Sequence, residues 1–105
     1  MIRHIVFFTA KSDGNIGPIR EGLALLTRIP HAQRLEIALN RKSDPLSQEI
    51  DVVVYGEFEN ELALAAYKAH ALYAESIKRV RPLRELRLAV DYDVDRAVSR
   101  VEPGV

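Results

Sequence analysis

Two segments of strand length are apolar on both of their faces, and this feature most constrains the fold. Residues 2–10 hold an unbroken run of β-branched and aromatic side chains, and residues 51–58 hold a second such run. Runs of this kind are typical of central strands, whose sheet needs an apolar cover on each side. Any fold for this chain must therefore bury both faces of its sheet.

Two other segments have the pattern of edge strands. Residues 34–40 and 86–94 alternate apolar and polar side chains, so each segment presents one apolar face. In the second segment one face collects five apolar residues, which are Leu86, Leu88, Val90, Tyr92 and Val94.

Two helices are predicted from apolar residues that recur at steps of three and four, over residues 15–30 and 60–80. Asn15 and Asn60 are candidate N-caps, and Pro30 and Pro82 mark the ends. In the second helix the spacing predicts one buried stripe, formed by Leu62, Ala66, Ala69, Tyr73, Ile77 and Val80.

The resulting order, β-α-β-β-α-β, predicts an α+β fold of the ferredoxin-like type. Its four-stranded antiparallel sheet carries two helices on one face, with residues 2–10 and 51–58 as central strands. Residues 1–95 form one domain, and residues 96–105 are a tail without a core of its own. Because nothing in the chain remains to cover the second sheet face, a second copy is the simplest cover, and we expect a homodimer.

The charge balance gives no reason to expect a polyanionic partner. Lysine plus arginine and aspartate plus glutamate number 15 each, so no global field favours nucleic acid or a membrane surface. A local basic cluster is interpreted as a solvated helix end, and it consists of Lys78, Arg79, Arg81, Arg84 and Arg87.

Residue types also limit the cofactors and the location. The chain has no cysteine, and its three histidines lie on separate predicted elements, so no metal site is expected. No phosphate-binding glycine motif is present, and we expect no cofactor. The N-terminal apolar run is short, and no segment approaches the roughly 20 apolar residues that span a bilayer. We expect a soluble, cytoplasmic protein without a membrane segment.

Five segments, taken in order, resemble the stress-responsive A/B-barrel (Dabb) family. They read MIRHIVFF at residues 1–8, VYGEFE at 54–59, AYKAH at 66–70, RPL at 81–83 and VDY at 90–92. The resemblance covers nearly all of residues 1–94 and implies a dimeric α+β barrel, in which two sheets pack face to face with the helices outside. It also implies kinship with polyketide cyclases, which close a ring by aldol condensation without a cofactor.

The resemblance also implies site residues on the second helix. The family's tyrosine position matches Tyr67, and His70 matches the first histidine of a His-Pro-x-His run. Tyr73 stands where the second histidine, the base of the cyclases, would be. That departure argues against ring closure in this chain.

A further pair is predicted across two strands. The resemblance places His4 on the sheet face toward the helices, and Asp91 lies on the strand face opposite Leu88. A hydrogen bond between them would fix the histidine tautomer. The candidate catalytic residues are thus His4, Tyr67, His70 and Asp91, and the candidate ligand contacts are Val6, Phe8, Val54 and Tyr73. Each also has a structural reading, as a satisfied buried pair, a boundary residue or a core filler.

Two function classes remain open from the sequence. The first is a non-catalytic, stress-associated homodimer that binds a small apolar ligand. The alternative is a cofactor-independent cyclase or isomerase that acts on a small polyketide-like carbonyl compound. The loss of the second histidine favours the first. A monooxygenase of the related superfamily has no motif in its support beyond the fold.

Overall fold

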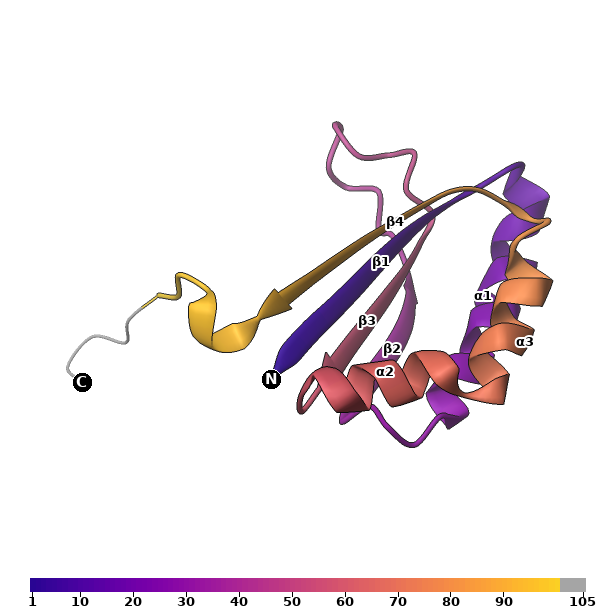
Figure 1. The fold of residues 1–105 in the computed structure, drawn as a ribbon. Coiled ribbons are helices and arrows are strands. Elements are labelled where there is room, and N and C mark those ends of the chain that lie inside the picture. The colour runs from indigo at the N-terminus through magenta and orange to yellow at the C-terminus, as the bar shows by residue number, and fades with distance from the viewer. Residues whose placement is uncertain (101–105) are drawn as a thin grey trace.

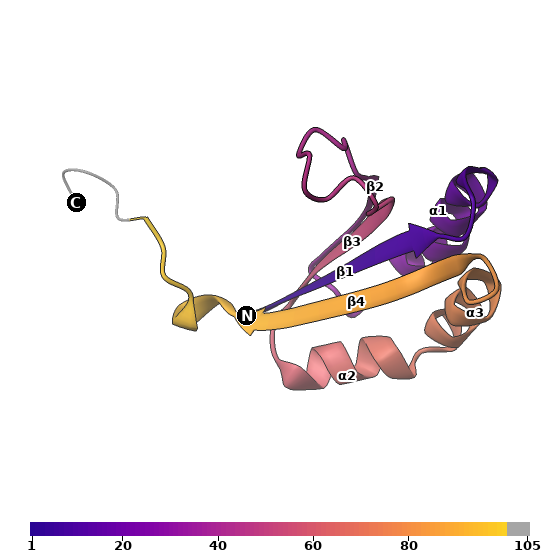
Figure 2. The same cartoon turned by 90° about the horizontal axis from the view of Figure 1, so that it is seen from above.

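A computed structural model describes residues 1–100 as one four-stranded antiparallel sheet with helices against one face (Figures 1 and 2). The strands are β1 (Ile2–Ala10), β2 (Arg34–Leu39), β3 (Val52–Phe58) and β4 (Arg84–Asp93). They lie in the order β2-β3-β1-β4. The α+β ferredoxin-like fold is therefore confirmed, with the two doubly apolar strands at its centre.

The first helix is shorter than the sequence predicts. Helix α1 (Ile16–Ala24) continues only as a 3-10 helix over Leu25–Arg28. Asn15 does not cap α1, because its side-chain amide donates to the Leu83 carbonyl at 3.1 Å instead. That bond ties the start of α1 to the start of β4.

The single helix predicted over residues 60–80 is wrong, since two helices, α2 (Glu61–Ala69) and α3 (Ala71–Val80), meet at His70. Asn60 does cap α2, and its Oδ1 accepts the Ala63 N–H at 3.0 Å. His70 has an extended backbone, with φ −69° and ψ 144°, and its Nδ1 accepts the Leu72 N–H at 3.1 Å. The imidazole caps α3 and competes with continuation of α2.

The predicted buried stripe fails in α2 and holds at Val80 in α3, because the break at residue 70 interrupts the helical rotation. Leu62 is 81% exposed, whereas Leu64 and Tyr67 are the buried residues of α2. In α3 the buried positions are Ser76 and Val80, while Ile77 is only partly covered. Tyr67, which the predicted stripe does not include, is completely buried.

Helices α1 and α3 pack closely through a glycine and a buried serine. A Cβ on Gly22 would lie 2.9 Å from Val80 Cγ2, so no other residue fits there without a shift. Ser76 Oγ donates to the Gly22 carbonyl at 3.0 Å and satisfies its own buried hydroxyl. Helix α2 instead runs beside β3. The change of direction at His70 leaves space between the helices and the sheet.

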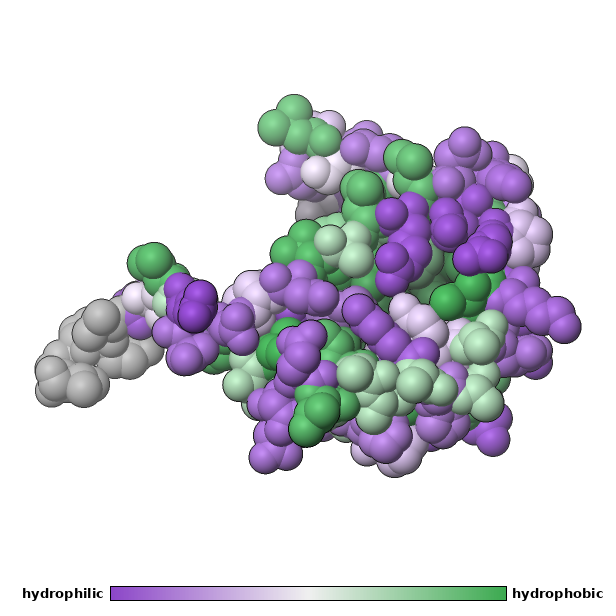
Figure 3. Space-filling view, viewed as in Figure 1, coloured by the Kyte–Doolittle hydropathy of each residue, from purple (hydrophilic) through white to green (hydrophobic). Residues whose placement is uncertain are grey.

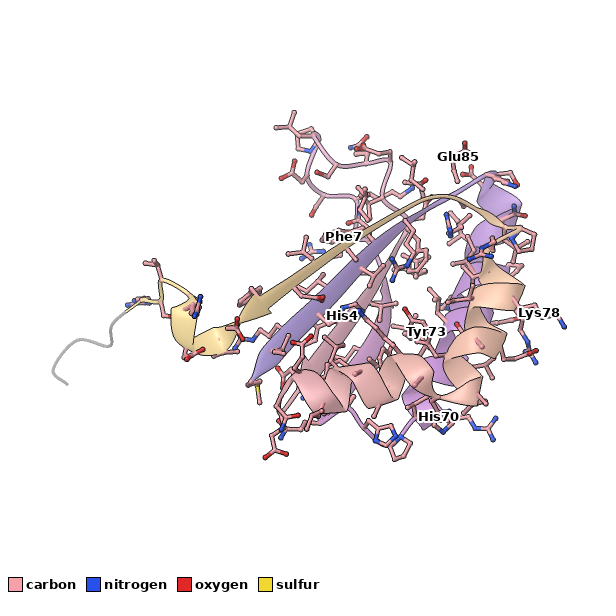
Figure 4. All side chains as sticks on the ribbon, in the orientation of Figure 1. His4, Phe7, His70, Tyr73, Lys78 and Glu85 are labelled. Atoms are coloured by element: carbon pink, nitrogen blue, oxygen red, sulfur yellow. The ribbon has the colours of Figure 1, made fainter. Side chains whose placement is uncertain are left out.

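The second sheet face has no helix over it. Phe7 lies on this face, on the side of β1 away from the helices (Figure 4). On β4, Leu86 and Leu88 are each 54% exposed and Val90 is 50% exposed. Their side chains share the face of Phe7 because Leu88 is its partner in the β1–β4 register. We call this surface the open face.

The chain beyond β4 begins with a 3-10 helix over Val94–Arg96. The remainder of the predicted tail is described only to residue 100, and residues 101–105 lie outside the described part. Within residues 1–100, no helix has the length and apolar character needed to cross a membrane.

Candidate functional site

A pocket of about 370 Å³ lies between the helices and the sheet. Such a volume is within the range of small-molecule sites. Its apolar wall comes from strands β1 and β3 and from the helical segments, and it consists of Val6, Phe8, Leu23, Leu26, Val54, Ile77 and Val80. Polar side chains enter from the same elements, namely His4, Tyr67, Tyr73 and Ser76. All four predicted ligand contacts, Val6, Phe8, Val54 and Tyr73, line this pocket.

His4 and Asp91 form the hydrogen bond that the sequence predicts. They are register partners on β1 and β4, so their side chains leave the same face of the sheet. His4 is 1% exposed, and its Nδ1 contacts the Asp91 carboxylate, whose side chain is 40% exposed. A carboxylate at Nδ1 makes that nitrogen the donor and leaves Nε2 as the ring atom available to a ligand. Asp91 itself does not line the pocket.

Tyr67 is the most deeply buried polar group of the pocket. Its ring packs against Phe58, Tyr73 and His4, with centroid distances of 4.8, 5.2 and 6.1 Å. Its hydroxyl is buried, and no group among residues 1–100 hydrogen bonds with it. Burial, and less so the neighbouring Tyr73, raises the pKa of the Tyr67 hydroxyl well above its ordinary value, while Arg87 opposes this. The hydroxyl therefore stays protonated and can donate a hydrogen bond.

His70 is not brought into the pocket. In Figure 4 it lies at the junction of α2 and α3, apart from His4 and Tyr73. Its Nδ1 is engaged as the cap of α3, and its ring stands edge-on to His31, with centroids 6.2 Å apart. His70, a candidate catalytic residue, therefore does not line the pocket that contains Tyr67 and His4.

Sequence reasoning missed the basic character of the pocket mouth. Four cationic residues line it, namely Lys68, Arg81, Arg84 and Arg87, and no acidic residue does. Arg87 donates to the Tyr73 hydroxyl across a long 3.4 Å contact. The interpretation of this cluster as a solvated helix end applies to Lys78, on the outer side of α3 in Figure 4, and to Arg79. The alternation of β4 carried a usable signal, since Arg87 shares the strand face of Asp91.

The geometry offers a donor and an acceptor to one bound molecule. Tyr67 can donate to a carbonyl or hydroxyl oxygen, and the Nε2 of His4 can accept a proton. Among the described residues, no three histidine, aspartate or glutamate side chains gather closely enough to hold a metal ion.

Solved structures share this fold at low sequence identity. A dimeric protein of unknown function from Bacteroides fragilis is 25% identical, with a TM-score of 0.70 over 88% of this chain and 94% of that one. A Dabb family protein from Mesorhizobium loti is 22% identical, with a TM-score of 0.72 over 88% and 94% of the two chains. A candidate antibiotic biosynthesis monooxygenase from Nitrosomonas europaea is 24% identical, with a TM-score of 0.71 over 89% and 97%. At these identities, the Mesorhizobium loti and Nitrosomonas europaea structures indicate a shared fold and nothing about function.

Curated proteins give no match to this chain. The family comparison, by contrast, matches almost the whole domain. The model of the stress responsive A/B barrel domain covers residues 2–94, from the first residue of β1 to just beyond the end of β4. The family model matches the chain over the whole four-stranded sheet and its helices, and the chain therefore belongs to the Dabb family.

Proposed function

We propose that this protein is a homodimer that binds a small, largely apolar molecule in the pocket between its helices and its sheet. The observation that carries the proposal is Tyr67, a residue of the pocket wall whose buried hydroxyl has no partner among residues 1–100. An unpaired buried hydroxyl costs about 1–3 kcal/mol. A ligand with a hydrogen-bond acceptor would recover that cost.

Two observations on the open face support the homodimer. The apolar row of Leu86, Leu88 and Val90 is about half exposed in the single chain, and a second copy would cover it. On the same face Arg3 donates to the Tyr92 hydroxyl at 2.9 Å, while its buried Nε has no partner among the described residues. The Bacteroides fragilis relative is itself described as dimeric. The pocket lies on the other face, so dimerisation leaves it accessible.

Blocking the pocket should abolish binding of a neutral aromatic ketone. We expect wild-type protein to bind 2-acetylnaphthalene saturably, as measured by ligand fluorescence or calorimetry. Ile77 lines the pocket at its partly exposed edge, so Ile77→Trp should weaken binding at least about tenfold by filling the space. Leu62→Trp makes the same change at an exposed helical position outside the pocket and should leave the affinity unchanged. Equal affinities in the two variants would contradict the proposal.

A second candidate function is proton transfer next to a carbonyl group, favoured by the His4–Asp91 hydrogen bond beside Tyr67. In this reaction the Nε2 of His4 would take a proton from the carbon next to the carbonyl. Tyr67 would donate a hydrogen bond to the carbonyl oxygen as it gains negative charge. No cofactor is needed for that step.

Hydrogen exchange tests this candidate without knowledge of the natural substrate. In D2O, wild-type protein should speed deuterium incorporation into the acetyl methyl group of 2-acetylnaphthalene by about 100-fold or more, as followed by proton NMR. His4→Leu should remove the acceleration, and His31→Leu, outside the pocket, should retain it. If free imidazole at the same concentration matched the protein, or if His4→Leu kept the rate, binding alone would remain as the function.

A further inference from the structure

We propose that the pocket selects an acidic ligand, with an apolar body inside and a carboxylate held by the arginines at the mouth. This inference rests on the proposed binding function and specifies its ligand class. Its starting observation is that the pocket lining contains three arginines, one lysine and no acidic residue. The whole chain, by contrast, has equal numbers of acidic and basic residues. The positive charge at the mouth is therefore a local arrangement.

The three arginines have no carboxylate of their own within the described part of the chain. None of the ion pairs found over residues 1–100 involves Arg81, Arg84 or Arg87. Arg79, two residues before Arg81, pairs instead with Glu75 at 3.1 Å and does not line the pocket. Arg79 is thus neutralised on the helix surface. The three arginines of the pocket have no such ion pair among the described residues.

The fold brings these arginines together from two elements. Arg81 follows α3 directly, whereas Arg84 and Arg87 belong to β4, where the register with β1 shifts between Phe8 and Ala10. Arg87 is paired with Phe8, so it shares the pocket side of the sheet with His4. Figure 3 shows hydrophilic side chains gathered on the visible face between β4 and α3. A guanidinium fork matches the two oxygens of a carboxylate.

The exposure of the lining residues increases from the inner end of the pocket to its mouth. Tyr67 and His4 are at most 1% exposed, Arg84 is half-buried, and Arg81 and Arg87 are exposed. A bound acid would keep its carboxylate at the wet mouth, where leaving water costs little, and its apolar body against Val6, Phe8 and Val54. Arg87 also acts inward, because its charge opposes the effect of burial on the Tyr67 pKa.

Two probes of nearly the same shape test the inference at pH 7.5. 2-Naphthoate carries a carboxylate where 2-acetylnaphthalene carries a neutral acetyl group. We expect wild-type protein to bind naphthoate about tenfold more tightly, as fits a charge-assisted hydrogen bond. The preference should shrink as salt is raised from 20 to about 300 mM, because the mouth is exposed.

Variants identify the residues responsible. Arg84→Gln combined with Arg87→Gln should bring the ratio of the two dissociation constants close to one, whereas Arg79→Gln should keep the wild-type ratio. Circular dichroism and urea unfolding establish that each variant is folded. If both probes bind equally in wild-type protein, or if Arg79→Gln alone removes the preference, the acidic-ligand inference is overturned and the binding function stands. If neither probe binds saturably, the binding function itself fails.

Discussion

Leu88→Asp should convert the proposed homodimer to a monomer. Leu88 lies at the middle of the apolar row on the open face, and it is 54% exposed in the single chain. In a symmetric dimer each substitution acts twice. Placing a carboxylate in an apolar interface costs at least about 2 kcal/mol per copy, so the dimer should weaken by at least about a thousandfold. Sedimentation equilibrium at micromolar concentration measures the change.

Leu62→Asp is the matched control for this experiment. It makes the same substitution at a leucine that is 81% exposed on α2, on the other side of the molecule from the open face. We expect this variant to remain dimeric. A wild-type chain that sediments as a monomer, or a Leu88→Asp variant that stays dimeric, would show that the open face is not the interface.

The sheet was predictable because its signal is local and its period is two. The doubly apolar runs identified β1 and β3 as central, and the alternating segments identified β2 and β4 as edges. The Asp91–His4 pair followed from the strand face of Asp91, from the pairing of the two strands and from the family resemblance that placed His4 toward the helices. A register shift of one residue would have moved Asp91 to the other face. The open face followed from counting the elements that remained to cover it.

The second helix was not predictable by the same reasoning, because its period is valid only while the helix is unbroken. No proline or glycine marks His70 as a break. An imidazole that caps α3 leaves no pattern in the sequence. Its effect is that the buried face of α3 is rotated relative to the buried face of α2. Tyr67 consequently lies in the buried centre although the predicted stripe left it out, and His70 does not line the pocket.

The arginines at the mouth were visible in the sequence and were misread for a related reason. Basic residues at the C-terminal end of a helix interact favourably with the helix dipole. Their interpretation as a solvated helix end therefore requires no bound anion. What distinguishes Arg84 and Arg87 from Arg79 is the element each belongs to, because β4 carries two of them to the pocket while α3 keeps Arg79 beside Glu75. Charge alone does not separate these residues, whereas their ion pairs and their place in the fold do.

Tyr67→Phe should make the protein more stable and a weaker binder of ketones. The side chain is fully buried, and its hydroxyl has no partner among residues 1–100. Removing that hydroxyl without changing the ring should raise the free energy of unfolding by about 1–2 kcal/mol. For a domain of this size that corresponds to a rise in Tm of roughly 4–8 °C per kcal/mol. Urea unfolding and thermal scans of the unliganded protein measure it.

The same substitution should cost affinity, because Tyr67 is the proposed donor to a bound carbonyl. We expect 2-acetylnaphthalene to bind Tyr67→Phe about tenfold more weakly, in proportion to one lost hydrogen bond. Tyr55→Phe is the control, because the Tyr55 hydroxyl lies on the open face and has a hydrogen-bond partner. It donates to Glu57 Oε2 at 2.5 Å. That variant should gain no stability and should keep its affinity for the ketone. A Tyr67→Phe variant less stable than wild type would mean that the hydroxyl serves the fold, whereas stability gained together with affinity lost is the expected signature of a group retained for its ligand.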